Sequence, residues 1–295
     1  MARRDIPARE PGLLSRAPPT GLVVGAIVSV QFGAALAATL FASVGPGGAV
    51  LLRLASASVV LLVIWRPRLR GRTRNELILT GVFGLDLAAM NLTFYNAIHR
   101  IPLGIAVSIE FLGPLAVAVG GSRRRIDLLW VGIAAAGILA LTRGGTHGLG
   151  ALGVAFALAA GVLWAAYILL NARLGQAFEG GTGLALSMCV ASVAVLPAGL
   201  IDGGGHLLEP RSLVVGTAVG ILSSAIPYSL ELEALRRISM HVFGVLMSLE
   251  PAMAALAGLL VLGQTLTVRA LLGIALVVIA SAGASLGARE PPVAV

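Results

Sequence analysis

The sequence predicts an all-α integral membrane protein: ten transmembrane helices as two inverted five-helix repeats, both termini cytoplasmic. Composition, the spacing of apolar segments and the distribution of arginine lead to this prediction. Of the 295 residues, 58% are hydrophobic and only 12% are charged, and the mean hydropathy is +0.97. A soluble domain carries about 25% charged residues and cannot hide this much apolar surface from water. The composition therefore excludes a soluble enzyme, a nucleic-acid-binding domain and a disordered regulator.

Apolar segments of nearly the length needed to cross a bilayer recur along the chain. A helix needs about 20 mostly apolar residues to cross a hydrocarbon core about 30 Å thick. An α-helix satisfies its own backbone in lipid, and the alternating pattern of a β-barrel is absent. The second and fifth segments are the shortest, so a count of nine stays open. The predicted spans are 21–43, 47–65, 76–97, 103–121, 126–142, 149–171, 181–201, 212–232, 240–262 and 267–287.

Arginine sets the predicted orientation. All 21 basic residues are arginine. With the N-terminus in the cytoplasm, 16 of them lie on the inner side and 4 on the outer side, and Arg53 lies within the second span. This asymmetry follows the positive-inside rule. Because the chain has no lysine, it lacks the Walker A lysine that a P-loop ATPase needs.

An internal repeat divides the chain. We predict a cytoplasmic tail at 1–19, repeats at 20–143 and 149–287, and a short cytoplasmic tail at 288–295. The repeats lie an odd number of spans apart, so they would cross the membrane in opposite directions, as in many secondary transporters. Five identities share an offset of 137: Ala97 with Ala234, Arg100 with Arg237, Ile101 with Ile238, Pro114 with Pro251, and Gly121 with Gly258.

Two glutamates inside predicted spans are the main candidates for a functional site. Glu110 lies four residues before Pro114 in the fourth span, and Glu250 immediately precedes Pro251 in the ninth. A charge at the bilayer centre costs about 2.5–3.5 kcal/mol on insertion scales, so each needs a reason to be there. A carboxyl group in an apolar cavity can exchange a proton during a cycle, and it binds ammonium when ionised. The alternative is that each glutamate only stabilises a kink or pairs with Arg53.

Further polar residues complete the predicted substrate-binding set. Asp86 and Asn91 lie in the third span, Arg53 in the second, and Tyr228 in the eighth. Asp86 and Arg53 are also candidates for an ion pair between spans. We interpret Gln31 as a hydrogen-bonding contact between helices. The same interpretation is the alternative to a binding role for Asn91.

Other polar and aromatic residues receive structural interpretations. Trp164 and Tyr167 lie on one face of the sixth span and could line a cavity or belong to the interfacial aromatic belt, and we favour the belt. We leave Glu231 outside the site, although it could face the inner vestibule. We expect no metal site and no cofactor. The histidines fall at span ends or in loops on both sides of the predicted membrane: His99, His147, His206 and His241.

Two segments resemble a known family. Residues 101–118 (IPLGIAVSIEFLGPLAVA) and 225–257 (AIPYSLELEALRRISMHVFGVLMSLEPAMAALA) are similar to the EamA-type transporters of the drug/metabolite transporter superfamily. The resemblance extends over nearly the whole chain. It implies a ten-helix inner-membrane carrier that exports small metabolites such as amino acids, driven by the proton-motive force. Gln264 departs from the pattern, because many members carry glutamate there.

The function we expect is secondary-active, proton-linked export of small neutral amino acids such as threonine and homoserine. Alternating access would occur around a midplane cavity in the bacterial inner (plasma) membrane. Glu110 and Glu250 would bind the ammonium group and carry protons, and Arg53 or a half-helix N-terminus would bind the carboxylate. The expected partners are the substrate, protons and the lipid bilayer, with no nucleic acid, and the protein would be a monomer or homodimer.

Three alternatives remain open at this point. An exporter of organic cations, drugs or other small metabolites needs only the carboxylates, and Arg53 would then be structural. A polytopic membrane enzyme needs a convergent acid/base or metal cluster. A non-transporting scaffold would tolerate the substitutions Glu110→Gln and Glu250→Gln without loss of function.

Overall fold

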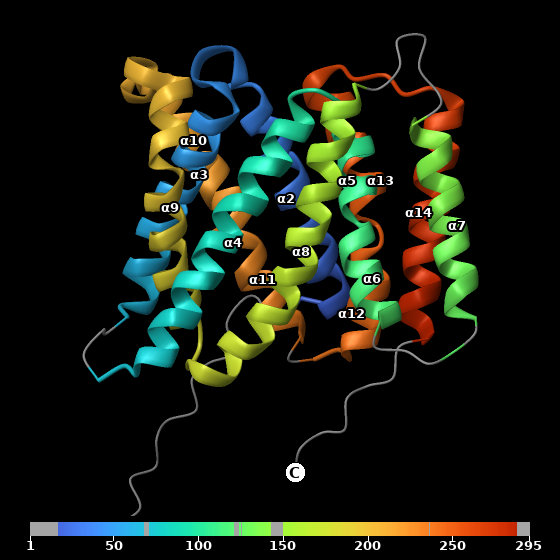
Figure 1. Cartoon of the computed structure of the whole chain (residues 1–295), viewed down its shortest axis with the longest axis horizontal. Coiled ribbons are helices and arrows are strands. Elements are labelled where there is room, and N and C mark those ends of the chain that lie inside the picture. The colour runs from blue at the N-terminus through green and yellow to red at the C-terminus, as the bar shows by residue number, and fades with distance from the viewer. Residues whose placement is uncertain are drawn as a thin grey trace, which may run out of the picture.

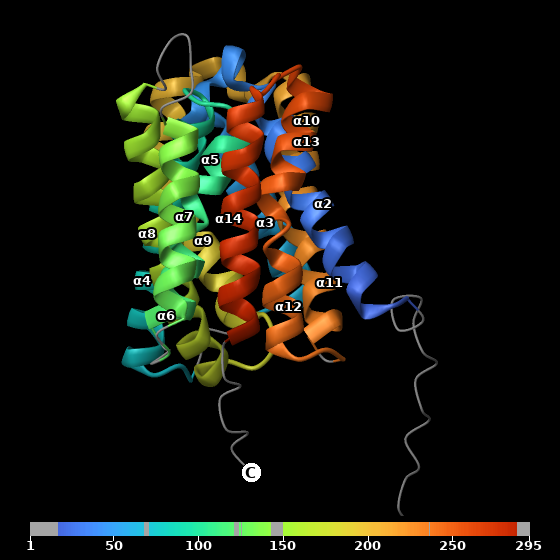
Figure 2. The same cartoon turned by 90° about the vertical axis from the view of Figure 1, so that its right-hand side faces the viewer.

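The computed structural model describes residues 17–67, 71–120, 124, 126–142, 150–235 and 237–287, and all of their regular secondary structure is helical. The elements form one upright bundle (Figures 1 and 2). In chain order they are α2 (Pro19–Ala38), α3 (Phe41–Trp65), α4 (Arg74–Ile98), α5 (Leu103–Glu110), α6 (Leu112–Gly120), α7 (Asp127–Thr142), α8 (Ala151–Ala177), α9 (Thr182–Gly203), η1 (Gly204–Leu208), α10 (Pro210–Gly220), η2 (Ile221–Ala225), α11 (Ile226–Leu235), α12 (Met240–Met247), α13 (Glu250–Leu262) and α14 (Val268–Gly287).

Nine helical segments of the described chain are long and apolar enough to cross a membrane. The predicted fifth span is α7, which is shorter at 16 residues. Large apolar side chains cover the outside of the bundle, and Val63, for example, is 65% exposed. Such a surface fits contact with lipid rather than water. The predicted tails lie almost entirely outside the described residues.

The connection between the first two predicted spans differs from the expectation. The sequence suggested a break between residues 43 and 47, but the first helix already ends at Ala38. The second helix bends sharply at Gly45, whose φ is +65°, next to Pro46. Gly45 tolerates this left-handed conformation because it lacks a Cβ. Asp202 of α9 accepts a hydrogen bond from the Gly47 N–H at 2.8 Å, which holds the bend in place.

Two spans are interrupted near their middle, as the prolines predicted. The fourth span consists of α5 and α6, which are separated at Phe111, and the ninth consists of α12 and α13. Pro114 and Pro251 lie just beyond these interruptions. A proline has no N–H to donate, and its ring clashes with the carbonyl group four residues earlier. For Pro114 that carbonyl belongs to Glu110. Helix α8 packs closely there, because a Cβ on Gly161 would lie 2.8 Å from the Glu110 carbonyl oxygen.

Helices distant in sequence pack side by side in the bundle. Helix α3 packs along α9, α4 along α8, α2 against α11, and α7 along α14. Helix α2 begins and α14 ends at the same end of the bundle, the lower end in Figures 1 and 2. We call this the terminal end.

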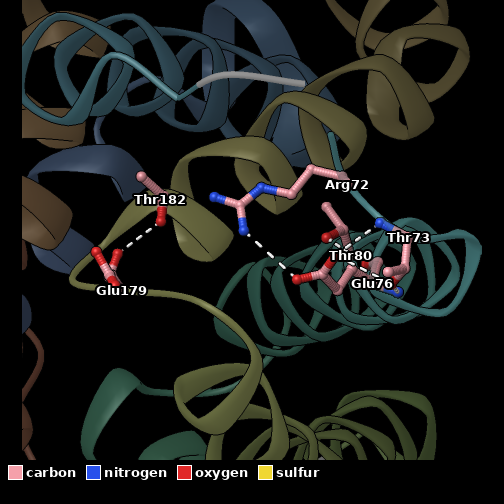
Figure 3. A network of polar contacts seen from close by, with 6 residues as sticks. All are labelled: Arg72, Thr73, Glu76, Thr80, Glu179 and Thr182. Atoms are coloured by element: carbon pink, nitrogen blue, oxygen red, sulfur yellow. Dashed lines mark hydrogen bonds and ion pairs between the residues drawn. The ribbon is translucent and has the colours of Figure 1, made fainter. Parts of the chain in front are cut away.

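A polar network fixes the start of α4 at the terminal end (Figure 3). Thr73 and Glu76 form a capping box, in which Glu76 accepts from the Thr73 N–H at 2.7 Å. Arg72 pairs with Glu76 at 3.4 Å and also lies 4.7 Å from the ring centroid of Phe178. The contact with Phe178 joins the loop before α4 to the turn between α8 and α9, where the Thr182 hydroxyl donates to the Glu179 carbonyl at 2.6 Å (Figure 3).

Candidate functional site

A cavity of about 650 Å³ lies inside the bundle, and eleven elements contribute to its wall. It extends from the two helix interruptions to residues close to the terminal end, such as Leu235 and Ser285. Most of its wall is apolar or aromatic. The charged and polar residues of the wall include Gln31, Arg53, Asn91, Glu110, Asn171, Ser223, Tyr228, Glu231 and Glu250.

The helix interruptions place both predicted glutamates in this cavity. Glu110 is the last residue of α5 and is 8% exposed, and Glu250 is the first residue of α13 and is 5% exposed. The Nε2 of Gln31 donates to the Oε2 of Glu250 at 3.5 Å, across the contact between α2 and α13. The Oε1 of Gln31 has no hydrogen-bond partner although the residue is only 3% exposed. Gln31 is therefore more than a contact between helices, because it lines the cavity beside a carboxylate.

Arg53 supplies a positive charge to the cavity wall. Its Nη1 donates to the Tyr95 hydroxyl at 3.3 Å, and its Nη2 donates to the Ser223 carbonyl at 3.5 Å. Ser223 belongs to η2, a π-helical turn, and such turns are frequent at functional sites. Among the described residues Arg53 forms no ion pair with a carboxylate, and its buried Nε has no partner. Arg53 and Glu110 line the same cavity without an ion pair between them.

Asp86 does not join the other predicted site residues. It lies in the middle of α4 and is 8% exposed, but it is not part of the cavity wall. The ion pair considered between Asp86 and Arg53 is not formed; Arg53 binds Tyr95 and Ser223 instead, and the Oδ2 of Asp86 has no partner. Helical periodicity explains the difference, because Asp86 and Asn91 are five residues apart and face different directions. Asn91 and Tyr228 both line the cavity.

Two aromatic residues and one glutamate were misjudged from the sequence. Trp164 and Tyr167 line the cavity rather than forming an interfacial belt. Trp164 packs edge-on against Phe111, with ring centroids 5.2 Å apart. Glu231 also lines the cavity, one turn beyond Tyr228 on α11. The signal that was available is the spacing of Trp164, Tyr167 and Asn171, which share one face of a helix.

Gln264 lies outside the cavity wall, near the end of the bundle opposite the termini. Its Oε1 accepts a hydrogen bond from the backbone N–H of Leu103 at 2.9 Å. Leu103 begins α5, and Gln264 follows α13, so this bond connects the two interrupted spans. Gly104 of α5 approaches α13 closely, since a Cβ there would lie 2.7 Å from the Cα of Ala255.

In the part of the chain that the structure describes, no group of three or more histidine, cysteine, aspartate or glutamate side chains is placed to hold a metal ion. Apolar helices around a cavity of this size with charged residues in its wall are typical of a membrane transporter of small solutes.

Comparison with known proteins gives the family. Residues 151–286 match the EamA-like transporter family. The Threonine/homoserine exporter RhtA of Salmonella typhimurium is 42% identical over 271 residues, which is 90% of this chain and 91% of that protein. The protein of the same name from Escherichia coli is 42% identical over 287 residues, or 95% of this chain and 96% of that protein. The chain belongs to the EamA-like transporter family and is a membrane transporter, not an enzyme.

A solved crystal structure has the same fold. It matches with a TM-score of 0.61 at 20% identity, covering 92% of this chain and 97% of that chain. At this identity the likeness concerns the fold alone.

Proposed function

We propose that the protein is a secondary-active exporter of small neutral amino acids such as threonine and homoserine, linked to protons and located in the bacterial inner (plasma) membrane. The observation that carries the proposal is that Arg53 and the two glutamates line one cavity without forming an ion pair among the described residues. Their charges are therefore available to a ligand. The 42% identity to Threonine/homoserine exporter RhtA supports the choice of substrate.

A free amino acid matches these charges. Its ammonium group would bind to Glu110 or Glu250, and its carboxylate would bind to Arg53, helped by the N-terminus of α13, where the helix dipole favours negative charge. Asn91 and Tyr228 would contribute hydrogen bonds from the cavity wall. Because Asp86 lies outside the wall, we assign it no contact with the substrate.

The two-repeat architecture belongs to this proposal, with repeats at 20–143 and 149–287. The packing of the helices supports it. When each helix is replaced by its counterpart in the other repeat, a contact between two helices becomes another contact that the structure contains. The contact of α4 with α8 corresponds to that of α11 with α2, and the contact of α6 with α8 corresponds to that of α13 with α2. The contacts of α3 with α9 and of α7 with α14 each correspond to themselves.

Ten crossings with both termini in the cytoplasm are the topology we propose. The start of α2 and the end of α14 lie at one end of the bundle, which supports an even number of crossings (Figures 1 and 2). Helix α7 then supplies the tenth crossing beside α14; its 16 residues are about 24 Å long. The arginine distribution supports a cytoplasmic terminal end, and the cavity would accept substrate from the cytoplasm.

Proton linkage would use the glutamates. A carboxyl group near the bilayer centre is costly when charged, so it is expected to bind either a proton or the substrate ammonium. Alternation between the two would couple proton entry to amino-acid exit. The α5–α13 contact opposite the termini would open when the cavity closes at the terminal end.

Uptake of labelled threonine and homoserine into proteoliposomes, with and without a pH gradient, tests this proposal. We expect gradient-driven accumulation in the wild type and its loss in Glu110→Gln. Glu179→Gln is a matched control, because Glu179 lies in an exposed turn outside the cavity. Saturable counterflow without dependence on the gradient would remove proton linkage. Folded protein that carries neither amino acid would refute the substrate assignment and favour organic cations.

A further inference from the structure

The cavity carries more acidic groups than a neutral amino acid requires. Three carboxyl groups line it, those of Glu110, Glu231 and Glu250, against the single guanidinium of Arg53. All three belong to the wall of the same cavity, and Gln31, which also lines it, donates to Glu250. Among the described residues none of the three forms an ion pair. The cavity therefore has more carboxyl groups than the guanidinium of Arg53 can neutralise.

The charge balance shows what this excess can hold. A zwitterion bound between one glutamate and Arg53 uses one carboxyl group and the guanidinium. Two carboxyl groups then remain in surroundings of low polarity, where uncompensated charge is costly. Each of them must take up a proton or face a second cation.

A separate observation indicates that this part of the wall lacks a hydrogen-bond donor. The Oε1 of Gln31 is a buried acceptor with no partner, while the Nε2 of the same side chain donates to Glu250. An ammonium group carries three donors and no acceptor, so it can satisfy this oxygen and a neighbouring carboxylate together. The phenol ring of Tyr228, one turn before Glu231, adds an aromatic surface of the kind that attracts cations.

We propose that the cavity also carries diamino acids, with the α-ammonium group at Glu110 and the second ammonium group bound by Glu231 and Glu250. This inference rests on the proposed function, because the α-amino and α-carboxylate groups occupy the same positions as in a neutral amino acid. The second ammonium takes the place of one proton in the charge balance. A cavity of about 650 Å³ leaves room for the longer side chain.

The sharpest probe is α,γ-diaminobutyrate, which differs from homoserine only in carrying an ammonium group where homoserine has a hydroxyl. Competition of each compound against labelled threonine in proteoliposome counterflow measures the preference for one over the other. We expect the wild type to exchange both, and Glu231→Gln to lower the preference for diaminobutyrate over homoserine by about tenfold, the scale of one charge-assisted contact. Glu233→Gln is the matched control on the same helix, since Glu233 pairs with Arg237 at 2.9 Å and lies outside the cavity wall.

The outcomes separate the two proposals. Exchange of homoserine without competition from diaminobutyrate would overturn the inference and leave the proposed function intact. An equal loss for both compounds in Glu231→Gln would overturn the assignment of Glu231. Exchange of diaminobutyrate without homoserine would support the inference and refute selectivity for neutral amino acids, whereas exchange of neither by folded protein would refute both.

Discussion

Replacing Gln264 tests how much the connection between the two interrupted spans contributes to stability. The backbone N–H of Leu103 donates to the Oε1 of Gln264 at 2.9 Å. As the first residue of α5, Leu103 has no acceptor for this N–H within its own helix, and its side chain is fully buried. The substitution Gln264→Met keeps the length of the side chain and removes the acceptor. We expect the free energy of unfolding to fall by about 1–3 kcal/mol, the cost of an unpaired buried donor.

For the substitution Gln264→Glu we expect no loss in the free energy of unfolding. It keeps an acceptor and adds a negative charge at the N-terminus of α5, which is favourable by about 0.3–1 kcal/mol. Thermal unfolding of all three proteins in one lipid or detergent system measures their midpoints. We expect the midpoint of Gln264→Glu to be at least that of the wild type, and the midpoint of the wild type to lie above that of Gln264→Met. Equal midpoints for Gln264→Met and the wild type, or a Glu variant below the Met variant, would refute this account.

Two further predictions concern packing and charge. Gly104→Ala forces α5 away from Ala255, so we expect a loss of about 1–3 kcal/mol in thermal unfolding together with impaired transport; the control Gly132→Ala meets open space and is expected to be neutral or stabilising. Arg53→Gln would remove the proposed contact with the substrate carboxylate, so we expect the KM for threonine to rise at least about tenfold, while inhibition by threoninol, which lacks the carboxylate, stays unchanged. A parallel change for both compounds would mean that Arg53 acts through the structure of the cavity.

The sequence predicted the features that depend on large energetic effects of single residues, namely the cost of a charge in lipid and the effect of proline on a helix. Charge is so costly in lipid that Glu110 and Glu250 had to face the interior, and Pro114 and Pro251 had to disturb their helices. Both predictions agree with the structure. The placement of Asp86 was less accessible, because a charged residue can avoid lipid at any helix contact and not only at the cavity.

The faces of mostly apolar helices are difficult to assign from the sequence. In the central part of α8 only Asn171, on the same face as Trp164 and Tyr167, marks the side toward the cavity, and without weighing it we assigned both aromatic residues to the interface. The partners of Arg53 were equally inaccessible. Its acceptor on η2 is a backbone carbonyl, and because every residue has one, the residue type does not indicate this partner.

In the proposed transporter, the close contact between α5 and α13 would determine where the membrane voltage acts. A cavity filled with water from the terminal end would conduct ions, so little of the voltage would fall along it. The drop would be concentrated across the layer formed by Gly104, Ala255 and their neighbours. Moving one elementary charge through the full potential is worth about 2.3 kcal/mol per 100 mV. Glu110 ends α5 and Glu250 begins α13, the two helices that form this layer, so a short movement of charge from either glutamate across it would capture most of the energy stored in the membrane.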